Sequence, residues 1–120
     1  MHETEMTRKY LTNILNQHEH CYLKKTVGSA FSKGMPDLVG TVYGRSTWIE
    51  VKKPGNKATP QQLTELKAHA AAGGYSAVCT IDTKNKRMTW ETIGEGGQAV
   101  KAMMLGQLQY WLRAWTVEGL

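Results

Sequence analysis

The stretch that most restricts how this chain can fold runs from Lys33 to Lys53, because it has the pattern of two strands joined by a tight turn. Strand-forming residues occupy 38–43 and 47–51, and residues 44–46, Gly-Arg-Ser, lie between them. A glycine at such a break permits a tight turn, and the flanking alternation of apolar and polar residues is typical of an antiparallel hairpin. We therefore predict a hairpin here.

The predicted hairpin gathers two acidic residues and a lysine. Side chains alternate along a strand, so Glu50 and Lys52 share one face of the second strand. A turn centred between residues 43 and 44 places Asp37 opposite Glu50. A turn centred between residues 44 and 45 places Asp37 opposite Lys52 instead. Either register brings all three side chains to one spot, since directly paired Cβ atoms lie about 5 Å apart.

Two carboxylates held this close repel each other by roughly 1–4 kcal/mol, depending on the local dielectric. A bound divalent cation removes that penalty, and carboxylate oxygens are the ligands that Mg²⁺ prefers. The hairpin therefore predicts a metal site formed by Asp37 and Glu50, with Lys52 beside it.

Composition and charge place few limits on function. With 120 residues the chain is predicted to form a single domain that buries roughly two-thirds of its unfolded surface. The net charge of +5 fits an anionic partner such as nucleic acid, but it equally fits a basic solvated surface. The two cysteines, Cys21 and Cys79, each fall in a predicted strand and are expected to be buried thiols. No signal peptide or membrane span is apparent, so a cytoplasmic location is expected.

Patterns on either side of the hairpin predict an α/β fold with a mixed sheet. Helices are expected over 3–19, 60–72 and 98–116, and further strands over 21–27, 75–81 and 87–93, the last of these being the final strand. The middle helix has Thr59 at its cap and Pro60 at its first position. That helix joins two strands by a crossover, and a crossover makes its two strands parallel.

Two of the helices carry features with more than one interpretation. Thr59 and Gln62 have the spacing of a capping box, in which the Gln62 side chain bonds back to the cap's amide. The final helix has a broad apolar face, and we hypothesise that part of it, including Trp111, forms a subunit interface. Light scattering that finds a monomer at micromolar concentration would reject this hypothesis.

Three short motifs occur in a fixed order along the chain. They are Gly34-Met35-Pro36-Asp37, Ile49-Glu50-Val51-Lys52 and Thr59-Pro60-Gln61-Gln62. Each one alone has a structural explanation as a turn, a solvated strand face or a helix cap. Together they resemble the PD-(D/E)XK nuclease superfamily, and within it the VRR-NUC family of stand-alone, phage-type nucleases. The resemblance covers about residues 3–82 and implies a restriction-endonuclease-like core.

The resemblance implies a role for each matching residue. Asp37 and Glu50 match the metal-binding acids, and Lys52 matches the catalytic lysine. The metal would be Mg²⁺ or Mn²⁺, and the carbonyl of Val51 would also reach it. Two further site residues are implied: the glutamine after the proline, matched by Gln62, and an N-terminal glutamate, matched by Glu3 with Glu5 as the alternative.

The family resemblance also implies an activity and partners. Its members hydrolyse phosphodiester bonds and leave 5′-phosphate ends, and the small members act on Holliday junctions or flap DNA as homodimers. The implied location is the cytoplasm of a bacterium or a phage-infected host. Basic side chains near the site would contact phosphates without reading sequence: Lys33, Arg45, Lys53 and Lys57. Two alternatives are a non-catalytic DNA-binding module and an interaction subunit that works through its C-terminal helix.

Overall fold

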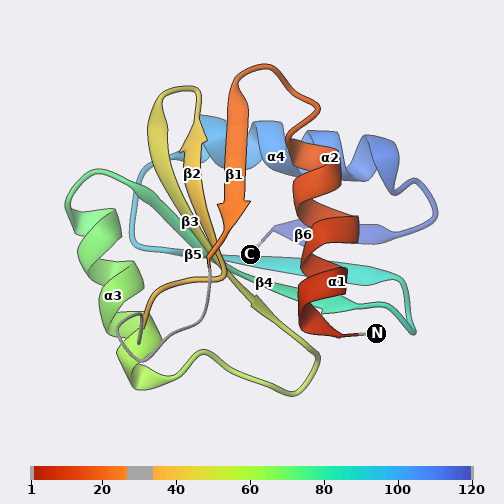
Figure 1. The fold of residues 1–120 in the computed structure, drawn as a ribbon, viewed down its shortest axis with the longest axis horizontal. Coiled ribbons are helices and arrows are strands. Elements are labelled where there is room, and N and C mark those ends of the chain that lie inside the picture. The colour runs from red at the N-terminus through yellow and green to blue at the C-terminus, as the bar shows by residue number, and fades with distance from the viewer. Residues whose placement is uncertain (1, 27–33, 120) are drawn as a thin grey trace.

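The chain forms one six-stranded mixed sheet with helices on both faces (Figure 1). This computed structural model describes residues 2–26 and 34–119. The strands, in sheet order, are β1 Cys21–Lys25, β2 Leu38–Val42, β3 Arg45–Lys52, β4 Tyr75–Asp82, β5 Arg87–Ile93 and β6 Thr116–Gly119. The two longest helices are α3 Pro60–Ala71 and α4 Gln98–Trp111.

Strand pairing confirms the α/β fold with a mixed sheet. The pairs β1–β2, β2–β3 and β4–β5 are antiparallel, whereas β3–β4 and β5–β6 are parallel. Each parallel pair is joined through a helix, α3 in the first case and α4 in the second. Parallel neighbours need such a crossover, because a short turn can only reverse the chain.

The central hairpin has a tighter turn than the sequence indicated. Val42 pairs with Arg45, so the turn consists of Tyr43 and Gly44 alone, and the expected turn at 44–46 was wrong. Both turn residues have positive φ, at 51° and 75°, as in the type I′ turn whose twist matches that of the flanking strands. The ladder ends with Leu38 opposite Ile49. The next position along therefore places Asp37 opposite Glu50, the first of the two expected registers.

The N-terminal helix ends earlier than expected and is not uniformly α-helical. It runs as α1 Glu3–Thr7, a π-helical segment Arg8–Thr12 and α2 Asn13–Leu15, so the expected end at residue 19 was wrong. The helix stops because the Asn16 side chain bonds both the amide and the carbonyl of Leu23 in β1, at 2.8 and 2.7 Å. The wider π turn shifts the buried face, because it adds a residue to that turn of the helix.

The C-terminal segment also differs from the expectation. Helix α4 ends at Trp111 rather than residue 116, and β6 then adds a strand beyond β5, which is therefore not the final strand. The Gln109 side chain closes this connection by donating to the Trp115 carbonyl and accepting from the Val117 amide, at 3.0 and 3.3 Å. The side chain of Trp115 packs on the ring of Tyr10, with centroids 4.7 Å apart.

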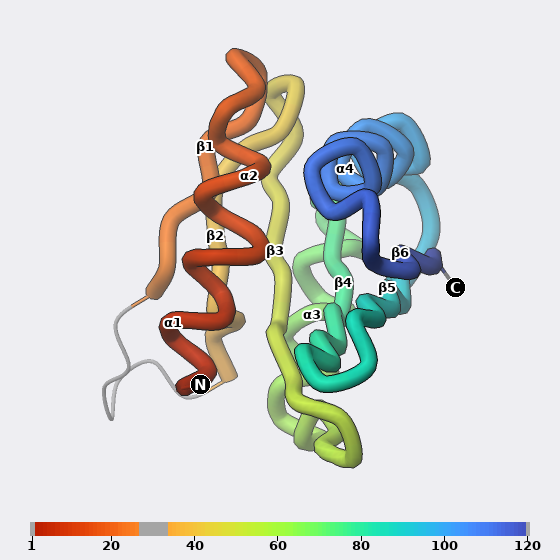
Figure 2. The backbone as a smooth tube through the Cα atoms, turned by 90° about the vertical axis from the view of Figure 1, so that its right-hand side faces the viewer, coloured from red at the N-terminus to blue at the C-terminus, as the bar shows by residue number. Residues whose placement is uncertain are grey.

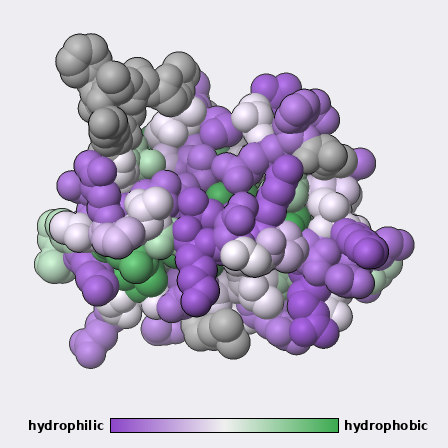
Figure 3. Space-filling view, turned by 90° about the horizontal axis from the view of Figure 1, so that it is seen from below, coloured by the Kyte–Doolittle hydropathy of each residue, from purple (hydrophilic) through white to green (hydrophobic). Residues whose placement is uncertain are grey.

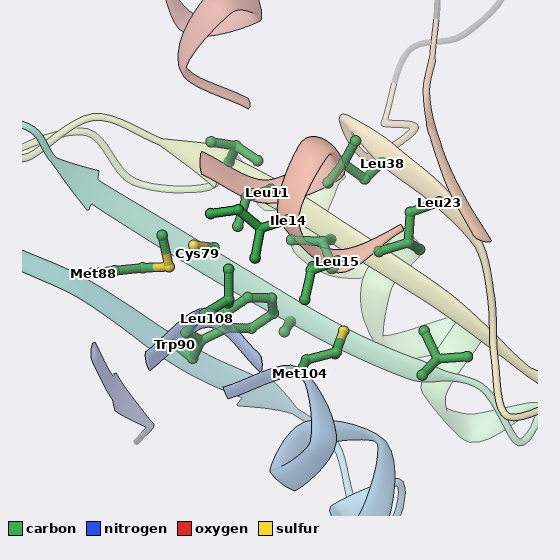
Figure 4. Close-up of a cluster of buried hydrophobic side chains, with 14 of the residues drawn as sticks. Leu11, Ile14, Leu15, Leu23, Leu38, Cys79, Met88, Trp90, Met104 and Leu108 are labelled. Carbon is green, nitrogen blue, oxygen red and sulfur yellow. The ribbon is translucent and has the colours of Figure 1, made fainter. Parts of the chain in front are cut away.

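The main hydrophobic core lies on the face of the sheet covered by α1, α2 and α4 (Figures 1 and 2). Side chains from the N-terminal helix and from α4 pack there against side chains of the strands (Figure 4). Helix α3 covers the opposite face over a smaller cluster built on Leu66, Val78 and Ile93. No helix within residues 2–26 and 34–119 is long and apolar enough to cross a membrane.

Both cysteines are free and buried, as predicted. Burial raises the pKa of the Cys21 thiol to about 11, so this thiol is protonated at neutral pH. Most of the broad apolar face of α4 is used within the chain, since Val100, Met104 and Leu108 are buried in the main core. Tyr110 and Trp111 remain exposed at its end.

Candidate functional site

The site lies where β2 begins, at the point beyond which β3 continues without β2 as a neighbour. Asp37, the residue before β2, accepts a hydrogen bond from the Val51 amide through Oδ2 at 2.8 Å. The side chain thus takes a position that the backbone of an extended β2 would have filled. Its other oxygen, Oδ1, lies 3.4 Å from the Lys25 ammonium at the end of β1. Asp37 is therefore held by a main-chain donor and by a cation.

Glu50 is the most unusual polar residue of the site. It is only 2% exposed, and its Oε2 atom has no hydrogen-bond partner among the described residues. The pKa of the Glu50 carboxyl is raised to about 9, mainly by burial and then by a hydrogen bond and the charge from Asp37, whereas the charge of Lys52 opposes the rise. A buried carboxylate oxygen without a partner is costly. A cation bound between Glu50 and Asp37 would remove that cost.

The backbone of Val51 offers a further oxygen at this place. Its side chain is buried in the main core, and its amide faces Asp37. The N–H and C=O of a residue in an antiparallel strand point to the same neighbour, so the Val51 carbonyl faces the same side. Lys52, the next residue, returns to the face of Glu50 and is half-buried.

Of the two N-terminal glutamates, Glu3 is the one that the fold brings toward the site. Glu3 is half-buried, and its negative charge contributes to the raised pKa of Glu50. Glu5 is exposed and makes no such contribution. Within residues 2–26 and 34–119, no three His, Cys, Asp or Glu side chains converge closely enough to hold an ion by themselves. The donors gathered here are oxygen atoms, the ligand type that Mg²⁺ takes, usually together with several waters.

Gln62 serves as a helix cap in this structure. Its amide nitrogen on the main chain donates to the Thr59 hydroxyl at 3.2 Å, and its side-chain oxygen accepts from the Thr59 amide at 2.9 Å. This is the reciprocal capping box that the spacing predicted. A role of Gln62 toward a substrate remains a prediction.

The basic residues expected to bind phosphate divide into separate groups. Lys53 and Lys57 are exposed in the segment that follows β3. Arg45 lies five residues before Glu50 on β3, about 17 Å away along the strand, so the two cannot contact the same phosphate. The Arg45 guanidinium donates to the Gly73 carbonyl at 3.1 Å. Lys33 lies outside the described residues.

Sequence reasoning missed the contact between Lys25 and Asp37. Strand β1 pairs with β2 so that Lys25 lies opposite Leu38, directly beside Asp37. The contact between Lys25 and Asp37 could have been predicted only from the register in which β1 pairs with β2. No sequence pattern predicts that register, because residues 26–37 separate the two strands.

The surface around the site is mostly hydrophilic. Seen from below, the side where α1 begins and β3 ends, hydrophobic residues show only in small areas between hydrophilic ones (Figures 1 and 3). Comparisons of the chain with protein-family models, with curated proteins and with solved structures found no match. The resemblance to VRR-NUC nucleases therefore rests on the motifs of this sequence.

Proposed function

We propose that this protein is a metal-dependent endodeoxyribonuclease of the VRR-NUC type, a hydrolase of the PD-(D/E)XK superfamily with a restriction-endonuclease-like core. The observation that carries the proposal is the Oε2 atom of Glu50, which is buried without a partner beside the carboxylate of Asp37. A protein that bound DNA only through its phosphates would gain nothing from two adjacent carboxylates, since both repel phosphate.

In this proposal Asp37, Glu50 and the Val51 carbonyl hold Mg²⁺ or Mn²⁺. The bound ion supplies an acidified water and stabilises negative charge on the phosphate. The Val51 amide and Lys25 fix the orientation of Asp37, so the site is largely preorganised. Lys52 orients the attacking water and stabilises the charge that develops on the phosphate oxygens. Glu3, at the start of α1, would supply a further carboxylate to the metal site.

The proposed substrate is branched or flapped DNA. Lys53 and Lys57 lie in the exposed segment after β3 and would contact phosphates on either side of the cut, which gives affinity without sequence readout. The exposed pair Tyr110 and Trp111 at the end of α4 is the surface proposed for a homodimer contact.

The test is cleavage of labelled linear, flap and four-way-junction DNA in Mg²⁺, Mn²⁺ or EDTA. We expect cuts with 5′-phosphate ends on the branched substrates, only with a divalent ion. Asp37→Ala and Lys52→Ala should abolish cleavage while DNA binding persists. Cleavage in EDTA, or by Asp37→Ala, would overturn the assignment of the site.

One observation favours the alternative of a non-catalytic DNA-binding module. Lys25 already neutralises Asp37 at 3.4 Å, so part of the carboxylate repulsion is relieved without any ion. In that case the protein would bind branched DNA with a steep salt dependence and would cut none of the substrates with either metal. An interaction subunit would show no salt-dependent DNA binding at all.

A further inference from the structure

A cavity of about 390 Å³ opens on the face of the sheet that α3 covers. Its lining comes from three parts of the chain: the segment between β3 and α3, the first turn of α3, and strands β4 and β5. The residues that matter for its chemistry are Lys57, Ala58, Leu63, Val78, Thr80 and Glu91.

The register of the sheet places this cavity directly beside the acidic site. Glu50 pairs with Val78, and Val78 pairs with Glu91, so the three form one row across β3, β4 and β5. Lys52 pairs with Thr80 in the next row. Neighbouring strands are about 4.8 Å apart, so the cavity floor begins one strand from Glu50, and Glu91 lies about 10 Å from it.

The lining combines an apolar floor with two opposite charges. Val78 is buried, and Ala58 and Leu63 pack against the same small cluster under α3. Lys57 and Glu91 are both exposed at the rim. Within the described part of the chain, the side chain of Glu91 forms no hydrogen bond or ion pair, although it lines the cavity. Its carboxylate is therefore available to accept hydrogen bonds from a ligand.

This chemistry fits a nucleobase better than a phosphate. A base has apolar faces that suit the floor, and its amino group donates to a carboxylate, as cytosine does to Glu or Asp. A phosphate at the same place would be repelled by Glu91. Lys57 is placed to hold the phosphate attached to such a nucleotide, outside the cavity.

We propose that this cavity receives the unpaired nucleobase next to the scissile phosphate, and that Glu91 selects a base that carries an amino group. This inference rests on the proposed nuclease function and specifies its substrate. A base in a continuous duplex must be unstacked and unpaired to enter, at a cost of a few kcal/mol, whereas a base at a flap or junction is already free. The cavity thus gives a physical reason for cleavage of branched DNA.

The first experiment compares flap substrates that carry A, C, G or T at the unpaired position beside the cut, with Mg²⁺ present. We expect the thymine substrate, whose base has no amino group, to be cut about 5-fold or more slowly than the others. Glu91→Ala should reduce the ratio between bases to near one. Glu95→Ala, which removes an exposed carboxylate from the loop before α4, is the matched control and should keep the ratio.

The second experiment measures binding in EDTA, so that it does not depend on cleavage. A flap DNA with 2-aminopurine at successive positions should change its fluorescence on binding at one position only, where the base enters the cavity. Ala58→Trp, which fills the cavity, should remove that signal, and its melting temperature relative to wild type shows whether it is folded. Thr80→Phe fills the cavity from the sheet and serves if Ala58→Trp does not fold.

The outcomes separate this inference from the function on which it rests. Equal cleavage of all four bases by the wild type, or a preference that survives Glu91→Ala, would overturn the base pocket while leaving the nuclease intact. No cleavage of any DNA with either metal would overturn the proposed nuclease. A 2-aminopurine signal that persists in a folded cavity-filling variant would also overturn the pocket.

Discussion

The two ends of the β2–β3 hairpin differ in the hydrogen-bond partners that they offer to a polar side chain that is partly or fully buried. At the turn end, His69 of α3 lies against a cavity of about 600 Å³, which is larger than the one beside the acids. Its ring nitrogens lie 2.7 Å from the hydroxyls of Ser46 and Ser76, and its ring stacks on Trp48 at 4.1 Å with an angle of 4°. Every polar atom of the ring has a partner.

At the other end, Glu50 has an oxygen with none. The indole nitrogen of Trp90 also lacks a partner among the described residues, but it is a neutral donor on a residue of the main core, whereas Glu50 is an acid beside Asp37. The comparison teaches that the partners of a polar group, rather than the size of the nearby cavity, distinguish a structural residue from a candidate site. His69 bonds α3 to the sheet, whereas one oxygen of Glu50 has no partner among the described residues.

The largest effect is expected for Glu50→Gln, which keeps the shape of the side chain and removes its charge. Cleavage of flap DNA should fall at least about 100-fold. The metal loses a charged ligand, and the charge that develops on the phosphate is then less well stabilised. In EDTA the same variant should be about as stable to urea as wild type, because the raised pKa of Glu50 leaves its carboxyl protonated at neutral pH and the amide of Gln is neutral as well. A variant that loses activity and stability together would show that Glu50 is structural, like His69.

Added Mg²⁺ should raise the melting temperature of the wild type. Binding to the folded state alone stabilises it by about 2.7 kcal/mol at a concentration 100 times the dissociation constant. Differential scanning fluorimetry over a Mg²⁺ series measures this, with Glu50→Gln as the variant that should not respond. An equal response in both proteins would place the ion elsewhere.

His69→Ala should cost about 2 kcal/mol of unfolding free energy in urea. The substitution leaves the buried hydroxyl of Ser76 without its partner, at a cost of about 1–3 kcal/mol, and removes the stack on Trp48. Cleavage per folded molecule should be unchanged. A large loss of cleavage at full folding would contradict the structural role given to His69.

The smallest effect is a pH dependence of stability at the same residue. Burial lowers the pKa of the His69 imidazole below its usual range, so the unfolded chain binds the proton first as the pH falls. Stability from this group is therefore complete above about pH 6.5 and decreases as the pH drops below that value. Urea titrations between pH 7.5 and 5 should show a shallower decrease for His69→Gln than for wild type.

The parts of the fold that the sequence predicted depend on neighbours close in the chain. The alternation around Gly44 and the spacing of Thr59 and Gln62 are local signals, and they led to the hairpin and to the capping box. Asp37 and Glu50 could be paired because only a short turn separates their strands, so both of the expected registers brought the two residues together. The pairing of the two acids was therefore predictable from the sequence, whereas their contacts with Lys25 and Val51 were not.

The parts that were missed depend on partners far along the chain. Strand β6 has few strong strand formers and forms because β5 offers a free edge, and the helix before it ends where Gln109 bonds the returning chain. The π turn at Arg8–Thr12 and the contact of Lys25 with Asp37 likewise depend on tertiary packing. Periodicity along one segment carries no information on such partners.

Because the Val51 amide donates a hydrogen bond to Asp37, the acidic site forms only when the strands of the sheet have paired. The carboxylate stands where the next rung of the ladder would be, so it reaches its position only after β2 has paired with β3 in the right register. A slip by one residue would turn Asp37 to the opposite face from Glu50. In the proposed nuclease, metal affinity would therefore depend on the hairpin register, and a misfolded or nascent chain would be unable to cut DNA.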